Sequence, residues 1–339
     1  MNLNVRLLAV LGILGLSAFV PVDVASADTS PAKFTSYPVP FEIPYGIVYD
    51  DTGPLKGVWF TNATLDAKSG AVEFLYKTGK TNLHATPTPA AKPASINFIP
   101  GSDSLWFPET NTNKIARIDS KRKITEFSIP TAGSKPMDIQ HGPDDAMWFT
   151  ESAVGKIGRI DSKGAIKEFT VGKSSDEPTA LIAQDGAMWF TEVGSNRMGR
   201  LTPTGEVKHF PTGAGKLTGD LTNTTDGALW APKDNSVVRL KADGTLTEFS
   251  LPGVVKTGAL FGRQDGVFIG AIKANGQGAI LAVSSEGKVK EYNLPQKYLL
   301  PIEMALNPDG GFFMTVRSIP KGHSMSMIWK LQLDSAKQK

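Results

Sequence analysis

Short stretches rich in β-branched and aromatic residues follow one another along almost the whole chain, separated by segments rich in Gly, Pro, Asp and Asn. Residues of the first kind favour strands, and residues of the second kind favour tight turns. Beyond the first residues, no stretch has a convincing helical period. The pattern therefore predicts an all-β protein built from short strands.

The strand-like stretches are organised in a repeat of 38 to 47 residues. Its clearest copies contain residues 146–151 and 187–192, which both read AMWFTE and are both followed by a segment with Gly-Arg. Each copy holds four strand-like stretches, which is typical of a four-stranded antiparallel blade. We therefore predict a seven-bladed β-propeller, with blades centred on Trp59, Trp106, Trp148, Trp189, Trp230, Phe268 and Phe313.

The two ends of the chain fit the closure of such a ring. Residues 34–40 resemble the fourth strand of the other copies but have no first three strands before them, and residues 327–333 resemble a third strand with no fourth after it. Pairing these ends would complete the seventh blade and leave no open edge. Residues 28–339 are thus expected to form one domain. In the third copy we expect strands at residues 137–140, 146–151, 156–161 and 166–171.

The repeated aromatic residues of the second strand are interpreted as core. We expect them to pack between neighbouring blades, because a large apolar ring contributes strongly to such an interface. Gly158 and Gly199, which recur in the third strand, are expected at positions of close packing.

The first residues have the features of an export signal. Arg6 precedes an apolar run from Leu7 to Val20, and residues 25–27 (ASA) offer a small-residue cleavage site, so that we expect cleavage before Asp28. The apolar run is too short to cross a bilayer as a stable helix. We expect a secreted or periplasmic protein without a transmembrane segment after cleavage; the alternative is an uncleaved N-terminal anchor.

Charge and composition narrow the possible partners. The net charge of +3 is weak and interspersed with acidic residues, which argues against nucleic-acid binding. The chain has no Cys, and this excludes disulfides, thiolate metal sites and a cysteine nucleophile. We expect a monomer stabilised by packing.

Candidate chemistry gathers on one rim, where the first strand of each blade begins and the second ends. Three second strands end in a carboxylate, and we interpret these as a possible site for a divalent cation: Glu109, Glu151 and Glu192. The alternative is that each satisfies a loop amide or pairs with a basic neighbour, namely Lys114, Lys156 or Arg197. Asn62 and Lys233 occupy the equivalent position in two other blades and are candidate ligand-binding residues.

The four histidines do not form a cluster in the predicted fold. His84 and His209 lie on outer strands, and His141 lies near a turn on the opposite rim. Only His323 falls in a loop on the candidate rim, where it could act as a general base. No Ser-His-Asp order, phosphate-binding glycine loop or metal-binding His pair is present.

The repeat itself resembles that of a known family. The succession of Trp-Phe-Thr-Glu, Ile-Gly-Arg-Ile and Glu-Phe-x-Pro, together with the Pro-Tyr-Gly-Ile that begins at Pro44, is similar to the streptogramin (virginiamycin B) lyases, and the similarity extends from Phe34 to Leu333. The resemblance implies a carbon-oxygen lyase that opens the ester of a cyclic depsipeptide by elimination, with Mg²⁺ as cofactor. It also implies that Tyr45 lies at the mouth of the axial funnel, as a functional group or as an aromatic lid.

The chain departs from this family where its chemistry resides. The resemblance implies catalytic histidines at the start of the first strand in blades six and seven, but residues 255–260 (VKTGAL) and 299–304 (LLPIEM) contain none. The family's metal-assisting Glu is replaced by Val316 or Arg317. A positioned base typically contributes a rate factor of about 10² to 10⁴. We therefore expect no streptogramin cleavage.

Three functional hypotheses remain. The first is a binding protein for a small molecule, glycan or peptide, held by Tyr45, Asn62, Lys233 and Thr257. The second is a metal-assisted carbon-oxygen lyase or hydrolase of another substrate, with Glu303 or His323 as base, Tyr45 as partner, and the Glu109, Glu151 and Glu192 set as metal ligands. The third is a protein-interaction scaffold.

Overall fold

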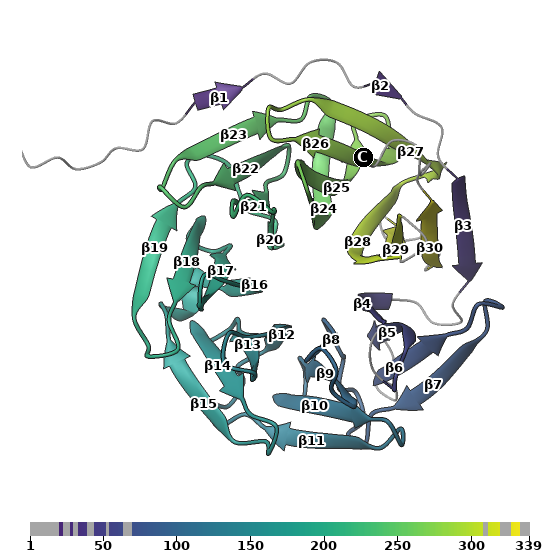
Figure 1. Cartoon of the computed structure of the whole chain (residues 1–339), viewed down its shortest axis with the longest axis vertical. Helices are drawn as coiled ribbons and strands as arrows, with labels where there is room; N and C mark the ends of the chain where they lie inside the picture. The colour runs from purple at the N-terminus through teal and green to yellow at the C-terminus, as the bar shows by residue number, and fades with distance from the viewer. Residues whose placement is uncertain are drawn as a thin grey trace, which may run out of the picture.

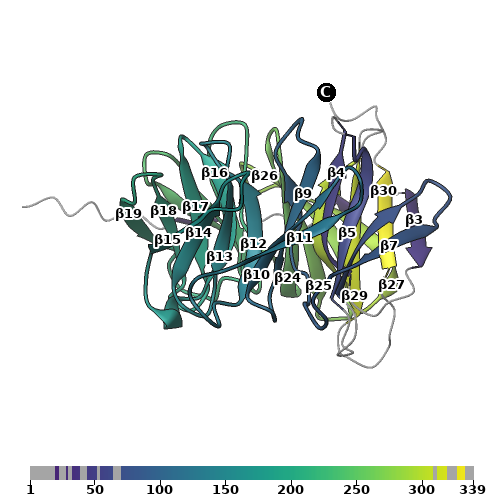
Figure 2. The ribbon, with the colours of Figure 1, turned by 90° about the horizontal axis from the view of Figure 1, so that it is seen from below.

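The computed structural model describes residues 20–22, 28–29, 33–38, 44–51, 54–63, 70–307, 311–318 and 327–332. Seven antiparallel sheets stand in a ring around a central axis (Figure 1), and a view from the side shows their strands running between the two faces of a disc (Figure 2). Within the described residues, the 3-10 turn Ser174–Asp176 is the only helical element. The prediction of an all-β, seven-bladed propeller is confirmed.

The first three blades follow one another along the chain. Blade one contains β4 (Pro44–Asp50), β5 (Gly57–Ala63), β6 (Gly70–Leu75) and β7 (Thr81–Ala85). Blade two contains β8 (Asn97–Phe98), β9 (Ser104–Glu109), β10 (Lys114–Asp119) and β11 (Ile124–Ser128). Blade three contains β12 (Pro136–His141), β13 (Met147–Glu151), β14 (Lys156–Ile160) and β15 (Ile166–Thr170). The strands expected in the third copy agree with these bounds to within about one residue.

The next three blades have the same order. Blade four contains β16 (Pro178–Gln184), β17 (Ala187–Glu192), β18 (Arg197–Leu201) and β19 (Val207–Pro211). Blade five contains β20 (Thr222–Asn223), β21 (Leu229–Pro232), β22 (Ser236–Leu240) and β23 (Leu246–Ser250). Blade six contains β24 (Val254–Arg263), β25 (Gly266–Lys273), β26 (Gln277–Ser284) and β27 (Val289–Lys297).

Blade seven joins the two ends of the chain. It contains β28 (Leu299–Leu306), β29 (Phe312–Ser318), β30 (Met327–Gln332) and β3 (Lys33–Pro38). The N-terminal β3 pairs antiparallel with β30, with Phe34 opposite Leu331 and Tyr37 opposite Ile328. The predicted closure of the ring by the N-terminal strand is confirmed, and Figure 1 shows β3 on the outside of this blade.

Two short segments before β3 lie along the outside of the ring. β1 (Val20–Val22) runs parallel to β23, and β2 (Asp28–Thr29) runs parallel to β27 (Figure 1). The body of the expected signal, residues 1–19, and the expected cleavage sequence at residues 23–27 lie outside the described residues. Within the described part of the chain, no helix is long and apolar enough to cross a membrane.

The core consists of layers between neighbouring blades. Trp148 of blade three is fully buried in one cluster with Phe190 of blade four, and the other repeated aromatic residues are buried in the same way. A Cβ atom at Gly158 would lie 2.0 Å from the Phe149 ring, so only glycine fits opposite this ring. Gly199 has the same relation to Phe190. The interpretation of the aromatic residues as inter-blade packing is confirmed, and so is that of the two glycines as positions of close packing.

Candidate functional site

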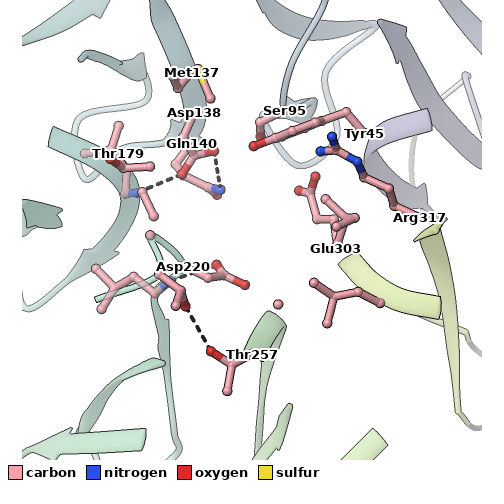
Figure 3. A pocket seen from close by; sticks show the side chains of 18 of the residues that line it. Tyr45, Ser95, Met137, Asp138, Gln140, Thr179, Asp220, Thr257, Glu303 and Arg317 are labelled. Atoms are coloured by element: carbon pink, nitrogen blue, oxygen red, sulfur yellow. Dashed lines mark hydrogen bonds between the residues drawn. The ribbon is translucent and has the colours of Figure 1, made fainter. Parts of the chain in front are cut away.

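A cavity of about 240 Å³ lies on the axis of the ring, among the first strands of the blades. Residues of β12, β16, β24 and β28 line it, together with Tyr45 of β4, Arg317 of β29 and the segment 218–221 that precedes β20. Figure 3 shows these side chains from close by. The first strands have only the axis beyond their inner edge, so the side chains that they direct inward face this cavity.

One position of the repeat places a carboxyl group in the cavity in blades three, five and seven. In β12, Ile139 lies opposite Phe149, and the residue before it is Asp138. In blades five and seven the residues at the same place are Asp220 and Glu303. All three line the cavity. The other four blades carry small residues there, namely Gly46, Ser95, Ala180 and Ala259.

Each of these three carboxyl groups also binds the backbone of the next blade. Asp138 accepts a hydrogen bond from the amide of Leu181 at 2.7 Å, and Asp220 accepts one from the amide of Leu260 at 2.5 Å. Glu303 accepts one from the amide of Ile47. The carboxyl groups thus link blades three to four, five to six and seven to one around the axis.

Burial changes the acidity of these groups. It raises the pKa of Asp220 to about 7, and it also raises the pKa of Asp138. The pKa of Glu303 is raised well above its ordinary value, first by burial and then by the charges of Asp138 and Asp220. Burial, followed by the charge of Glu303, raises the pKa of Tyr45 to about 12. The phenol therefore stays neutral near pH 7, and the three carboxyl groups are not all ionised there.

Two cationic side chains also line the cavity. Arg317 stands at the end of β29, next to Tyr45, and Lys256 stands near the start of β24. Among the described residues, neither side chain has a hydrogen-bond or ion-pair partner, and the same holds for the Tyr45 hydroxyl. Figure 3 shows Arg317, Tyr45 and Glu303 on one side of the cavity and Asp138 and Asp220 on the other.

The structure brings together three of the residues singled out from the sequence. Tyr45, Thr257 and Glu303 all line the cavity, and Thr257 donates a hydrogen bond to the Lys233 carbonyl at 2.5 Å. His323 lies outside the described residues.

Asn62 and Lys233 are held within their blades and do not line the cavity. Asn62 is buried and donates a hydrogen bond to Glu73 at 2.9 Å. The Lys233 ammonium is also buried, and it donates to the carbonyl oxygen atoms of Thr212 and Ala214 and pairs with Glu248. The Asn62 amide nitrogen and the Lys233 ammonium therefore both have partners inside the protein.

The three carboxylates at the ends of second strands are also buried in separate blades, and none of them lines the cavity. Glu192 pairs with Arg197 and His209, as the alternative interpretation expected for Arg197. Lys114 and Lys156 instead pair with two carboxylates of the fourth strands, Glu126 and Glu168. The remaining two second-strand residues, Glu109 and Glu151, accept no ion pair from these lysines.

Their burial has a strong effect on proton affinity. Burial, with the nearby charge of Glu126, raises the pKa of Glu109 to about 7, although a hydrogen bond from Thr112 opposes the shift. Burial, followed by the charge of Glu168, raises the pKa of Glu151 to about 8. A carboxyl group that holds its proton near neutral pH is a poor ligand for a hard cation.

The magnesium ion that the family resemblance implies does not fit these residues. In the described ranges, no group of three His, Asp or Glu side chains is arranged so that it could hold a metal ion. The cavity carboxyl groups are engaged by backbone amides, and the cationic Arg317 and Lys256 share the same space. We therefore derive no chemistry from a metal at this site.

Sequence reasoning missed Asp138, Asp220, Arg317 and Lys256 as cavity residues. The signal for the two aspartates was present: they stand directly before a buried apolar residue, Ile139 or Leu221, at the repeat position where Glu303 precedes Met304. It could have been found by aligning the copies on their first strands instead of on the Trp-Phe motif of the second.

Comparisons with known proteins agree with this fold. The model of the Virginiamycin B lyase family matches residues 32–321. The solved virginiamycin B lyase of Staphylococcus aureus, in selenomethionine-substituted form, is 28% identical over 90% of this chain and 100% of its own, with a TM-score of 0.76. A catalytically inactive histidine-to-alanine form of that enzyme with quinupristin is 26% identical over the same shares, with a TM-score of 0.77.

A further solved structure, a streptogramin B lyase, is 26% identical over 89% of this chain and 98% of its own, with a TM-score of 0.75. No curated protein sequence matches the chain. The family model covers most of the chain and the solved structures share its ring over their full length. This chain belongs to the virginiamycin B lyase family.

Proposed function

We propose that this chain is an exported member of its family that binds a small polar ligand in the axial cavity and does not cleave streptogramin B antibiotics. The observation that carries the proposal is the lining of the cavity in blades six and seven. Where the resemblance implies catalytic histidines, the lining consists of Lys256, Thr257, Gly258, Leu300, Ile302 and Glu303.

Elimination needs a base that is ionised and free to accept a proton at the pH of the reaction. Thr257, Gly258 and Ile302 have no such group. The raised pKa of Glu303 reduces its ionised fraction near neutral pH, and its carboxyl group already accepts the Ile47 amide. The cavity itself persists, with charged groups that have no partner in the described structure. This combination favours binding over the family's reaction.

The loss of lyase activity is tested with quinupristin, the compound present in a relative's structure. The purified chain is incubated with quinupristin and Mg²⁺, and the products are analysed by mass spectrometry. We expect the antibiotic to remain intact, while the Staphylococcus aureus enzyme, as the positive control, converts it. Conversion by this chain would refute the proposal.

Ligand binding is tested by a thermal-shift screen of small polar metabolites. A hit should raise the melting temperature of the wild type and should lose its effect in Thr179→Trp, because Thr179 lines the cavity and a larger side chain there would fill it. Leu83→Trp, an exposed position on the outer strand β7, is the matched control. Hits that respond equally in both variants would place binding elsewhere.

Export is tested on the chain produced in a bacterial host with its full N-terminus. We expect the protein outside the cytoplasm with Asp28 as its first residue, measured by intact mass. A membrane-bound protein that retains Met1 would support the uncleaved anchor instead.

A second function has one observation in its favour. The pKa of Asp220 is about 7 and that of Glu303 is also raised well above its ordinary value, which is an arrangement suited to general acid-base chemistry. A hydrolase or lyase acting on another ester would use these two groups without a metal. Turnover of an ester panel that is lost in Glu303→Gln and unchanged by a chelator would favour it.

A further inference from the structure

The axial cavity offers charges of both signs that the protein leaves available. The Arg317 guanidinium, the Lys256 ammonium and the Tyr45 hydroxyl are donors with no partner among the described residues. A guanidinium in a partly enclosed site is well suited to bind a carboxylate or a phosphate through two hydrogen bonds. The donors therefore predict an anionic group on the ligand.

The carboxyl groups of the cavity predict a cationic group on the ligand as well. Asp138 and Asp220 each accept two backbone amides and keep further acceptor capacity, and Glu303 accepts one. A purely anionic ligand would be repelled by these groups, and a purely cationic one would be repelled by Arg317 and Lys256. A ligand with both charges would be attracted by both sets.

The arrangement in space matches a small molecule with separated charges. Arg317 and Tyr45 stand on one side of the cavity, and Asp138 and Asp220 stand across from them (Figure 3). The volume of about 240 Å³ lies below the common range for drug-sized ligands, about 300 to 1,000 Å³. The enclosed part of the ligand is therefore smaller than a cyclic depsipeptide.

We infer that the cavity binds a small zwitterion, whose carboxylate meets Arg317 and whose ammonium group meets Asp138 and Asp220 on the other side. This inference rests on the proposed binding function and names its ligand class. A neutral polyol, which would bind through hydrogen bonds alone, is the competing class.

The experiment measures the binding of matched probes by ligand-observed NMR at pH 8. The probes are ω-amino acids from glycine to 6-aminohexanoate, each with the carboxylic acid and the amine of the same chain length, and 1,4-butanediol as the neutral probe. At least one amino acid should bind about ten-fold more tightly than its matched acid, its matched amine and the diol, since a charge-assisted hydrogen bond contributes a factor of this order.

Variants separate the two ends of the ligand. Arg317→Met should weaken the binding of the amino acid and of the acid about ten-fold and leave the binding of the amine unchanged. Asp220→Asn should weaken the binding of the amino acid and of the amine and leave the binding of the acid unchanged. Arg317→Gln and Asp138→Asn repeat the two tests with a second replacement and at a second carboxyl group, so that a folding defect in one variant does not decide the result. Melting temperatures verify that each variant is folded.

Two results would overturn the inference. The first is that an acid, an amine or the diol binds at least as tightly as every amino acid, and that Thr179→Trp abolishes this binding. The cavity would then be a binding site for another ligand class, and the proposed function would stand. The second is the absence of binding by every probe and every compound of the metabolite screen, with which both the inference and the proposed function would fail.

Discussion

Two sets of carboxyl groups in this protein differ in whether they recur with the sequence repeat. The first set, Glu109, Glu151 and Glu192, ends the second strands of three successive blades and is enclosed within them. The second set, Asp138, Asp220 and Glu303, belongs to alternate blades and lines the axial cavity. In this ring, the carboxyl groups that recur with the second-strand motif are enclosed within their blades, whereas those that break the regularity of the first strands line the axial cavity.

The largest effect is expected from breaking an ion pair of the enclosed set. Glu192→Ala leaves Arg197 and His209 without their shared acceptor, and we expect a loss of about 3 kcal/mol in the free energy of unfolding. Chemical denaturation measures this loss. Glu206→Ala, which removes an exposed partner of Lys208, is the control and should change stability by less than about 1 kcal/mol. Equal effects of both substitutions would contradict the structural role of Glu192.

The next effect concerns pH. The folded-state pKa values of Glu109, about 7, and Glu151, about 8, lie above those of an unfolded chain, so the folded protein binds more protons between about pH 4.5 and 8. The contribution of these two residues to the free energy of unfolding is therefore fully present below about pH 4.5 and is lost as the pH rises to 8.

Glu151→Gln should remove part of this loss, on the order of 2 kcal/mol after allowance for the coupling to Glu168. The measurement is the free energy of unfolding of wild type and variant at pH 5 and pH 8. A stability difference between the two proteins that is the same at both pH values would show that Glu151 titrates normally.

The axial set should respond in ligand binding. Because the pKa of Asp220 is about 7, its ionised fraction rises roughly ten-fold from pH 6 to pH 8, and the affinity for an amine probe should rise with it. Asp138, Glu303, Tyr45, Arg317 and Lys256 face the same cavity, so Asp220→Asn is needed to assign the change. A pH dependence that survives in Asp220→Asn would move the assignment to Asp138 or Glu303.

The smallest effect is expected for stability at the axis. Asp220→Asn loses one of two amide contacts but also a buried charge, so at pH 7 the free energy of unfolding should change by less than about 1 kcal/mol. Denaturation of this variant beside Glu192→Ala sharpens the contrast between the two sets. A loss as large as that of Glu192→Ala would make Asp220 a scaffold residue as well.

The sequence was sufficient for the fold because the second strands pack on both faces. Trp148 and Phe149 contact different neighbouring blades, so their residue types recur and the repeat is visible. The site was only partly predictable. Tyr45, Thr257 and Glu303 were singled out, but Asp138, on its first strand, and Asp220, just before one, were not. The residue type at this position changes from blade to blade, so the recurring Trp-Phe motif of the second strand does not mark it.

The antiparallel pairing of β3 with β30 determines when, during synthesis and folding, the ring can close. β3 leaves the ribosome well before β30, so the ring becomes continuous only after β30 has been synthesised. Until then, blade seven is incomplete, and the faces of blades one and seven that pack against each other are exposed. A deletion of β30 would therefore leave β3 without its partner and harm the assembly of the whole ring.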